Sequence, residues 1–191
     1  MSEQIKDGKG RGFLAQVNED QDLVTRSISV EQRLKATLDG NYYEATTGKV
    51  TLANATETGL IYLKNTHTTM SMVIDRVFWD VWASTGGAGG GTLRYYKDVT
   101  VVGGTAITPN ITLYGQPNAA QGTFLKSVTS LSGTEWWTGL LEASTSIALD
   151  EGRIVLPKNA THLISVAAPA GNTSMDVSIN VAFYYFNTDL V

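Results

Sequence analysis

Strict alternation of apolar and polar residues near the C-terminal end is the feature that most constrains the fold of this 191-residue chain. Within residues 174–186, apolar side chains occupy every second position: Met175, Val177, Ile179, Val181, Phe183 and Tyr185. A repeat of two residues places successive side chains on opposite faces of a β-strand. The segment therefore predicts a strand with one face in a core and the other face toward solvent.

Short alternating runs of the same kind recur from about residue 41 onward, separated by clusters of Gly, Asn, Asp, Ser and Thr. Further strands are expected at 59–65, 92–99, 136–143 and 160–168, and residues 147–157 are expected to form a hairpin that turns at Asp150, Glu151 and Gly152. Only residues 26–38 offer a window of helical length. We therefore expect an all-β fold, a jelly-roll-like two-sheet β-sandwich, over residues 37–191.

One strand, at residues 70–83, is apolar on both faces. Val73, Val77, Trp79, Val81 and Ala83 share one face by alternation, and the opposite face holds five more apolar side chains: Met70, Met72, Ile74, Phe78 and Trp82. Because a sandwich buries only one face of each strand, the second set is expected to contact a loop, the N-terminal segment or another subunit.

Residues 1–36 differ from the rest of the chain. They hold six basic and six acidic side chains, which is 12 of the 32 charges in the sequence (14 basic plus 18 acidic). With so few bulky apolar residues this segment cannot close a core, so we expect an extended N-terminal arm for contact with a neighbouring subunit. Its expected contact residues are Ile5, Asp7, Gly8, Gly10, Gly12, Phe13, Leu14 and Val17. A frayed terminus, or a first hairpin docked on its own domain, stays open as the alternative.

The composition limits the kinds of partner that the chain is expected to bind. The net charge of −4 and the pI near 5.1 argue against electrostatic binding of nucleic acid or of an anionic membrane. The chain has no cysteine, which excludes disulfides and thiolate chemistry. The start of the sequence is polar, and no apolar run reaches the length of a membrane span, so neither a signal peptide nor a transmembrane segment is expected.

Few residues in the sequence suggest catalysis or cofactor binding. His67 lies in a polar turn and His162 in an alternating strand, and neither has a second ligand at metal-binding spacing, so both are expected to be structural or solvated. The glycine clusters at 8–12 and 86–91 lack the strand, helix and Lys-Ser/Thr context of a phosphate loop. No enzyme activity, metal or cofactor is therefore expected, although a carboxylate pair for glycoside cleavage stays open because distant residues can meet in space.

Aromatic doublets occur four times, at 42–43, 95–96, 136–137 and 184–185. Alternation puts one ring of each doublet on each side of its strand, so about half of the rings are expected to point away from the core. Exposed rings suit subunit interfaces, which we favour, and they also suit stacking on sugars. The glycan-stacking alternative concerns Tyr95, Tyr96, Trp136 and Trp137.

Several phrases, taken in order, resemble a family of tailed-bacteriophage virion structural proteins of the head decoration (cement), minor capsid or head-fibre type. They are IKDGKGRGFLAQVNEDQDLVTRSISV, GLIYLKNTHTTMSMVIDRV, STGGAGGGTL and LPKNATHLISVAAPAGNTSMDVSI, followed by the aromatic end of the chain.

The resemblance implies a non-enzymatic β-sandwich on the capsid surface of a virion assembled in the bacterial host cytoplasm. The major capsid protein or other virion proteins would be its partners, and further copies of the chain, by analogy three, would form a homo-oligomer. A carbohydrate- or receptor-binding module of a tail or fibre is the alternative function.

Overall fold

The computed structural model describes the backbone of residues 4–6, 12–14, 16–17, 23–24, 32–53, 56–85, 90–112, 118–141, 147–171 and 174–186. Side chains are described within these ranges from residue 34 onward, except at 82–85, 130 and 147–153. The chain forms two compact units, Met1–Glu31 and Gln32–Val191.

The first unit contains two short antiparallel pairs of strands. Strand β1 (Gln4–Lys6) pairs with β2 (Gly12–Leu14), with Ile5 opposite Phe13, and β3 (Gln16–Val17) pairs with β4 (Leu23–Val24). Isolated two-stranded hairpins are marginally stable in water. The role of this unit as an arm stays a prediction.

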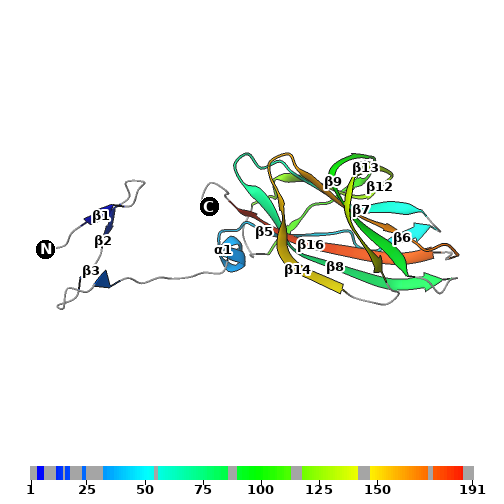
Figure 1. Ribbon diagram of the computed structural model, residues 1–191, viewed down its shortest axis with the longest axis horizontal. Coiled ribbons are helices and arrows are strands. Elements are labelled where there is room, and N and C mark those ends of the chain that lie inside the picture. Colours follow the sequence, from blue (N-terminus) through cyan, green and yellow to red (C-terminus); the bar gives the residue numbers. More distant parts are fainter. Residues whose placement is uncertain are drawn as a thin grey trace. The chain divides into compact units, whose positions relative to one another are not determined.

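The second unit is a sandwich of two antiparallel sheets, which confirms the predicted fold class (Figure 1). The first sheet has the order β11 (Asn110–Ile111), β5 (Tyr42–Thr46), β16 (Ser174–Phe186), β8 (Ser71–Thr85) and β14 (Ile147–Leu156), with β6 (Val50–Ala53) also paired to β16. The second sheet has the order β10 (Thr105–Ala106), β12 (Gly122–Val128), β7 (Glu57–Asn65), β15 (Thr161–Ala167), β9 (Gly91–Val102) and β13 (Ser130–Leu141).

Eight of these strands follow the jelly-roll order. If β5, β7, β8, β9, β13, β14, β15 and β16 are numbered one to eight along the chain, the sheets have the orders 1-8-3-6 and 2-7-4-5. The chain thus crosses between the sheets at nearly every connection, as in a double Greek key. The last strand, β16, lies inside the first sheet between β5 and β8, where neighbours cover both of its edges.

The main core lies between the sheets, and β16 supplies the face that its alternation predicts. All six apolar residues of that face are buried in one cluster: Met175, Val177, Ile179, Val181, Phe183 and Tyr185. Phe183 stacks on Tyr43 at 5.6 Å and on Phe124 of the facing sheet at 5.2 Å between ring centroids. The sheets are therefore joined by a continuous aromatic contact.

A short helix, α1 (Gln32–Leu38), covers the outer face of the first sheet. Its Ala36 is buried against Tyr42, Val73 and Tyr184, and the rings of Tyr42 and Tyr184 stack at 6.2 Å. Residues 32–36, which charge density alone groups with the arm, thus belong to the second unit.

The second sheet curls onto its own outer face at one end (Figure 1). Strand β9 pairs with β15 only as far as Lys97, and Asp98 has a φ of 55°, which turns the strand away. At the far end of the β9–β13 ladder, the amide of Thr129, which lies between β12 and β13, donates a 3.1 Å hydrogen bond to the Val102 carbonyl. A smaller apolar cluster fills the curl: Tyr62, Tyr96, Val99, Val128 and Leu163.

The predicted faces of the strand at 70–83 are wrong in its first half. Opposite β16, strand β8 has one extra residue at Asp75, so the alternation inverts there. Met72 and Ile74 consequently lie in the main core together with Val77 and Trp79, and Val73 lies on the outer face under α1. The apolar face of five residues expected there is not formed.

The predicted hairpin at 147–157 is also wrong. Residues 147–156 form the single strand β14 along β8, with an irregularity between Asp150 and Ile154. The Asp-Glu-Gly signal thus marks an interruption of the ladder rather than a reversal of the chain.

Among the described residues, none of the helices is long and apolar enough to cross a membrane.

Candidate functional site

The exposed apolar side chains concentrate on strand β13, an edge strand of the second sheet. Three of the seven large apolar residues that are exposed in the described part of the chain lie on it: Trp136, Trp137 and Leu140, with exposed fractions of 45%, 36% and 76%. We call these three residues the β13 strip. Scattered exposed leucines are ordinary, but adjacent exposed tryptophans on an edge strand are the surface feature that requires an explanation.

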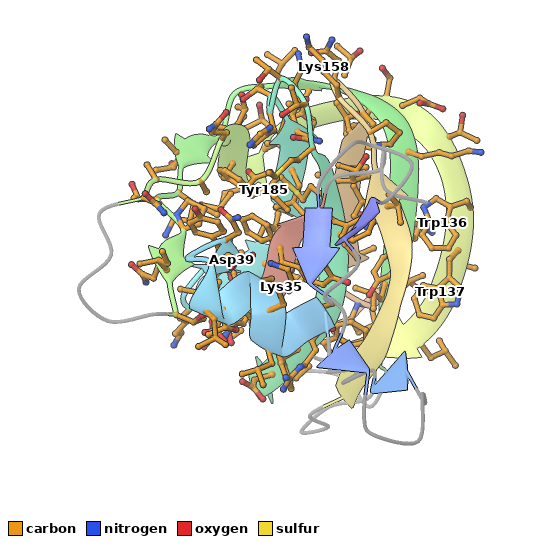
Figure 2. All side chains as sticks on the ribbon, turned by 90° about the vertical axis from the view of Figure 1, so that its left-hand side faces the viewer. Lys35, Asp39, Trp136, Trp137, Lys158 and Tyr185 are labelled. Carbon is orange, nitrogen blue, oxygen red and sulfur yellow. The ribbon has the colours of Figure 1, made fainter. Side chains whose placement is uncertain are left out.

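A β-bulge sets the direction of the two tryptophans. Glu135 pairs with Tyr96 and Trp137 pairs with Tyr95, so Trp136 is an extra residue in the ladder. Both indole rings therefore contact the same ring, Tyr95, at 5.7 Å for Trp136 and 4.9 Å for Trp137. Figure 2 shows both side chains on the same side of the molecule, along β13. The expectation that one ring of the doublet lies on each side of the strand is wrong.

Gly139 makes room for the second indole. A Cβ at this position would lie 2.5 Å from the Cη2 atom of Trp137, so a side chain on Gly139 would displace the ring. Trp137 therefore lies along its own strand, with one region packed on Gly139 and Tyr95 and the rest open to solvent.

Beneath the strip, aromatic rings continue into the core. Tyr95 contacts Trp79 of the opposite sheet at 6.4 Å, and the His162 ring lies 5.3 Å from Tyr95 and 6.0 Å from Trp136. Burial lowers the pKa of His162 to about 4, although a hydrogen bond with the Tyr96 backbone acts in the opposite direction. His162 is consequently neutral at pH 7 and is a packed structural histidine.

His67 is held by the turn that connects β7 and β8. Its Nδ1 accepts hydrogen bonds from the backbone amides of Thr69, at 3.2 Å, and Met70, at 3.1 Å, and its ring lies 5.1 Å from Tyr185. Burial lowers the pKa of His67 as well. Both accepted hydrogen bonds require an unprotonated nitrogen, so the geometry also favours the neutral ring.

A polar network lies on the outer face of the second sheet. Glu57 accepts hydrogen bonds from Tyr96 Oη at 2.8 Å, from Ser165 Oγ at 2.5 Å and from Arg94 Nη1 at 2.7 Å. Arg94 Nε also lies 3.5 Å from Glu135 Oε2. Burial, and then the hydrogen bond to Glu57, raise the pKa of Tyr96 to about 12. The two carboxylates thus share one guanidinium.

The sequence-predicted contact residues of the sandwich are distributed over different environments. Met72 and Ile74 are buried in the main core, Met70 is partly buried against it, and Phe78 is half-buried. The side chain of Trp82 lies outside the described residues. The structure does not gather these five into one accessible surface.

The predicted arm residues fall partly within the first unit's strands. Ile5 lies in β1, Gly12, Phe13 and Leu14 lie in β2, and Val17 lies in β3. Asp7, Gly8 and Gly10 lie outside the described residues.

Of the four residues proposed for glycan stacking, only Trp136 and Trp137 are exposed. Tyr95 and Tyr96 are buried, on opposite faces of the second sheet. Leu140 was missed from the sequence, although the run from Trp136 to Leu141 contains no charged residue and so carries a signal for an uncharged edge.

Across the described residues, no group of three or more His, Asp or Glu side chains is placed to hold a metal ion. A scan against known protein families finds no match, and a search of curated proteins finds no relative of this chain.

Proposed function

We propose that this protein is a non-enzymatic structural component of a bacteriophage virion, which decorates or cements the capsid. In this proposal the first unit binds the shell or a neighbouring subunit, and the sandwich remains on the particle surface. The observation that best supports the proposal is the division of the chain into two units. The first unit contains short strand pairs, and the second forms a jelly roll with a core of its own.

The first unit supports the proposal because its strands are too short and too few to be stable by themselves. Its strands are two or three residues long and pair only as two hairpins among the described residues. Segments of this kind gain order when a partner supplies further pairing and apolar contact. Lattice attachment suits this arrangement, since many weak contacts on one particle act together.

The sandwich supports the proposal through its architecture. Jelly rolls recur in viral capsid proteins and in lectins, so the fold is compatible with both the leading function and its alternative. Glu57 accepts hydrogen bonds from Arg94, Tyr96 and Ser165, and Arg94 also pairs with Glu135.

Attachment to shells tests the proposal. The full chain and a chain lacking residues 1–31 would be mixed with shells assembled from the major capsid protein of the same phage, and bound protein would be quantified after sedimentation. We expect the deletion to abolish binding. The cut belongs after Glu31 and not after Ala36, because Ala36 is buried under the sandwich's own outer face.

Point variants refine this experiment. Ile5→Ser and Phe13→Ser change residues that pair across the β1–β2 hairpin, and Leu38→Ser changes an exposed helix residue as a matched control. Weaker binding is expected for the arm variants only. Undiminished occupancy by the chain without residues 1–31 would contradict the proposal.

Glycan binding is the second candidate, and it rests on Trp136 and Trp137. Their exposed indoles on one side of a strand offer faces on which a sugar ring can stack. A glycan array probed with the full chain and with Trp137→Ala is the direct test. Sugar signals that vanish with Trp137→Ala would favour this candidate, whereas an array without signal would remove it.

A further inference from the structure

We infer that copies of this chain contact one another through the β13 strip, around a symmetry axis that runs beside this edge of the sandwich. The inference rests on the proposed function, because it locates the subunit contact that a decorating homo-oligomer needs. Its test is made on isolated protein, so it can fail while attachment to shells succeeds.

The first argument is that charged or covering side chains do not protect the apolar residues of this edge among the described residues. Natural edge strands are guarded by lysine, proline, inward charges, β-bulges or a covering segment. Strand β13 has neither lysine nor proline, and its single charged residue is Glu135. Its side chains instead include the exposed Trp136, Trp137 and Leu140. A strand of this composition at the open edge of a sheet is expected to be covered in the assembled protein.

The second argument concerns the kind of contact. The register of β13 against β9 shifts between Ser132 and Thr134 and again between Glu135 and Trp137. Bulges of this kind twist an edge and interrupt the row of backbone groups that another strand would pair with. The contact is therefore made by side chains, with indoles and Leu140 packing against a partner, and not by addition of a strand.

The third argument is charge, which favours a copy of the same chain over a strongly charged partner. In a symmetric contact the same surface, or its near neighbour, is presented by both subunits, so unpaired charge on it would meet like charge. Glu135, beside the strip, lies 3.5 Å from Nε of Arg94, which also pairs with Glu57 of the same subunit. The strip itself consists of three uncharged side chains, so two copies can pack against each other there without like charges meeting, and it offers nothing to a strongly charged partner.

The fourth argument is that part of the apolar face expected at residues 70–83 is already buried within the subunit. Met72 and Ile74 are in the core, and the outer face beside them is covered by Ala36 of the chain's own helix. The tryptophans, by contrast, continue the ring contacts of Trp79 and Tyr95 outward to the surface. A second copy placed there would extend the apolar interior across the contact.

The test is the mass of the full chain in solution, measured by light scattering after size exclusion over a range of concentrations. Leu140→Lys places a cation on each copy's strip, at a side chain that is 76% exposed and contributes little to the core. Leu38→Lys is the matched control, because it makes the same substitution at a leucine that is 63% exposed on α1. Trp136→Ser is the second strip variant.

We expect a wild-type oligomer whose dissociation constant rises about tenfold or more with Leu140→Lys and with Trp136→Ser, and is unchanged with Leu38→Lys. Tryptophan emission should shift to longer wavelength when the strip is uncovered. The chain lacking residues 1–31 should keep the wild-type oligomeric state, because the strip belongs to the second unit.

Four results would overturn the inference. The first is a wild-type chain that is monomeric at every concentration, and the second is an equal effect of Leu140→Lys and Leu38→Lys on the dissociation constant. The third is loss of the oligomer on removal of residues 1–31, and the fourth is a monomer whose tryptophan emission responds to a sugar from the array. The third result would identify the arm as the occupant, and the fourth would identify a glycan. Strip variants that are monomeric and still bind shells would support the inference and leave the proposed function standing.

Discussion

Asn65 and Leu156 tie the two sheets of the sandwich together. The Asn65 side chain, at the end of β7 in the second sheet, donates a 2.8 Å hydrogen bond from Nδ2 to the carbonyl of Leu156 in β14 of the first sheet. Nδ2 also donates to the Met70 carbonyl at 2.9 Å, and Oδ1 accepts from the His67 amide at 2.9 Å. Asn65 is fully buried, so this one amide satisfies three backbone groups that would otherwise lack partners.

Asn65→Leu is therefore expected to destabilise the protein by about 2–4 kcal/mol, because it leaves buried polar groups unsatisfied while keeping the side-chain volume. The free energy of unfolding in urea is the measurement. Thr51→Ala is the control: Thr51 donates a 2.6 Å hydrogen bond to Asp176 at an exposed position, and its loss should cost under about 0.5 kcal/mol. Similar losses of unfolding free energy for both variants would show that the hydrogen bonds of Asn65 do not stabilise the contact between the sheets.

Gly59 occupies a position where β7 has no room for a side chain. A Cβ there would lie 2.1 Å from Cγ2 of Val128 and 3.1 Å from Cδ1 of Leu163, and both neighbours are buried. Gly59→Ala should destabilise by about 1–3 kcal/mol through overpacking of the cluster under the curled β9–β13 hairpin.

Val128→Ala provides the complementary change. It removes the methyl groups that the new Cβ would strike, so the double variant should be more stable than the sum of the single effects predicts, by about 1 kcal/mol. Urea denaturation of the four proteins measures this coupling. Strictly additive losses would show that the contact between position 59 and Val128 is not the cause.

Acid should weaken the fold through His162. An unfolded histidine titrates near 6.5, and burial lowers the pKa of His162 to about 4, so the unfolded chain binds a proton first as the pH falls. The stabilisation is full above about pH 6.5 and is lost between about pH 6.5 and 4. Lowering the pH from 7 to 5 should cost about 2 kcal/mol from this group.

His162→Phe keeps an aromatic ring in the cluster and removes the titration. Its unfolding free energy should depend less on pH between 5 and 7 than that of the wild type, whatever its absolute stability. His67→Gln is the comparison, since the pKa of His67 is also lowered and it contributes with the same sign. An unaltered pH slope in His162→Phe would show that the acid sensitivity originates elsewhere.

The sequence predicts those strands that alternate without interruption, and β16 shows why. Its six inward residues follow one another at every second position, so the face is determined as soon as the strand is recognised. Strand β8 fails this reasoning because a single extra residue at Asp75 inverts the faces, and the choice of Asp75 as a bulge depends on the register of β16 beside it.

The β13 strip escapes prediction for the same physical reason. Alternation assigns Trp136 and Trp137 to opposite faces, yet the bulge at Trp136 directs both rings to Tyr95. Strand β14 shows the converse error, since Asp150, Glu151 and Gly152 have the composition of a turn, while the surrounding ladder with β8 keeps the chain in one strand. Turn composition and bulge composition overlap, and only pairing with a neighbour distinguishes them.

The boundary between the two units makes a final prediction about stability. Removing residues 1–31 should change the melting temperature of the chain by less than about 2 °C, because the described residues of the sandwich's buried clusters all lie in the second unit.

Removing residues 1–39 also deletes α1 and with it Ala36, which covers Tyr42, Val73 and Tyr184. Exposure of that cluster should cost about 2 kcal/mol or more, which corresponds to a fall of about 4–8 °C for a chain of this size. Calorimetry of the two truncated chains makes the comparison. Leu34→Ser in the full chain is the control, because Leu34 lies on the helix but is 52% exposed, and its replacement should leave the melting temperature near the wild-type value. Equal melting temperatures for the two truncated chains would show that α1 does not contribute to the stability of the sandwich.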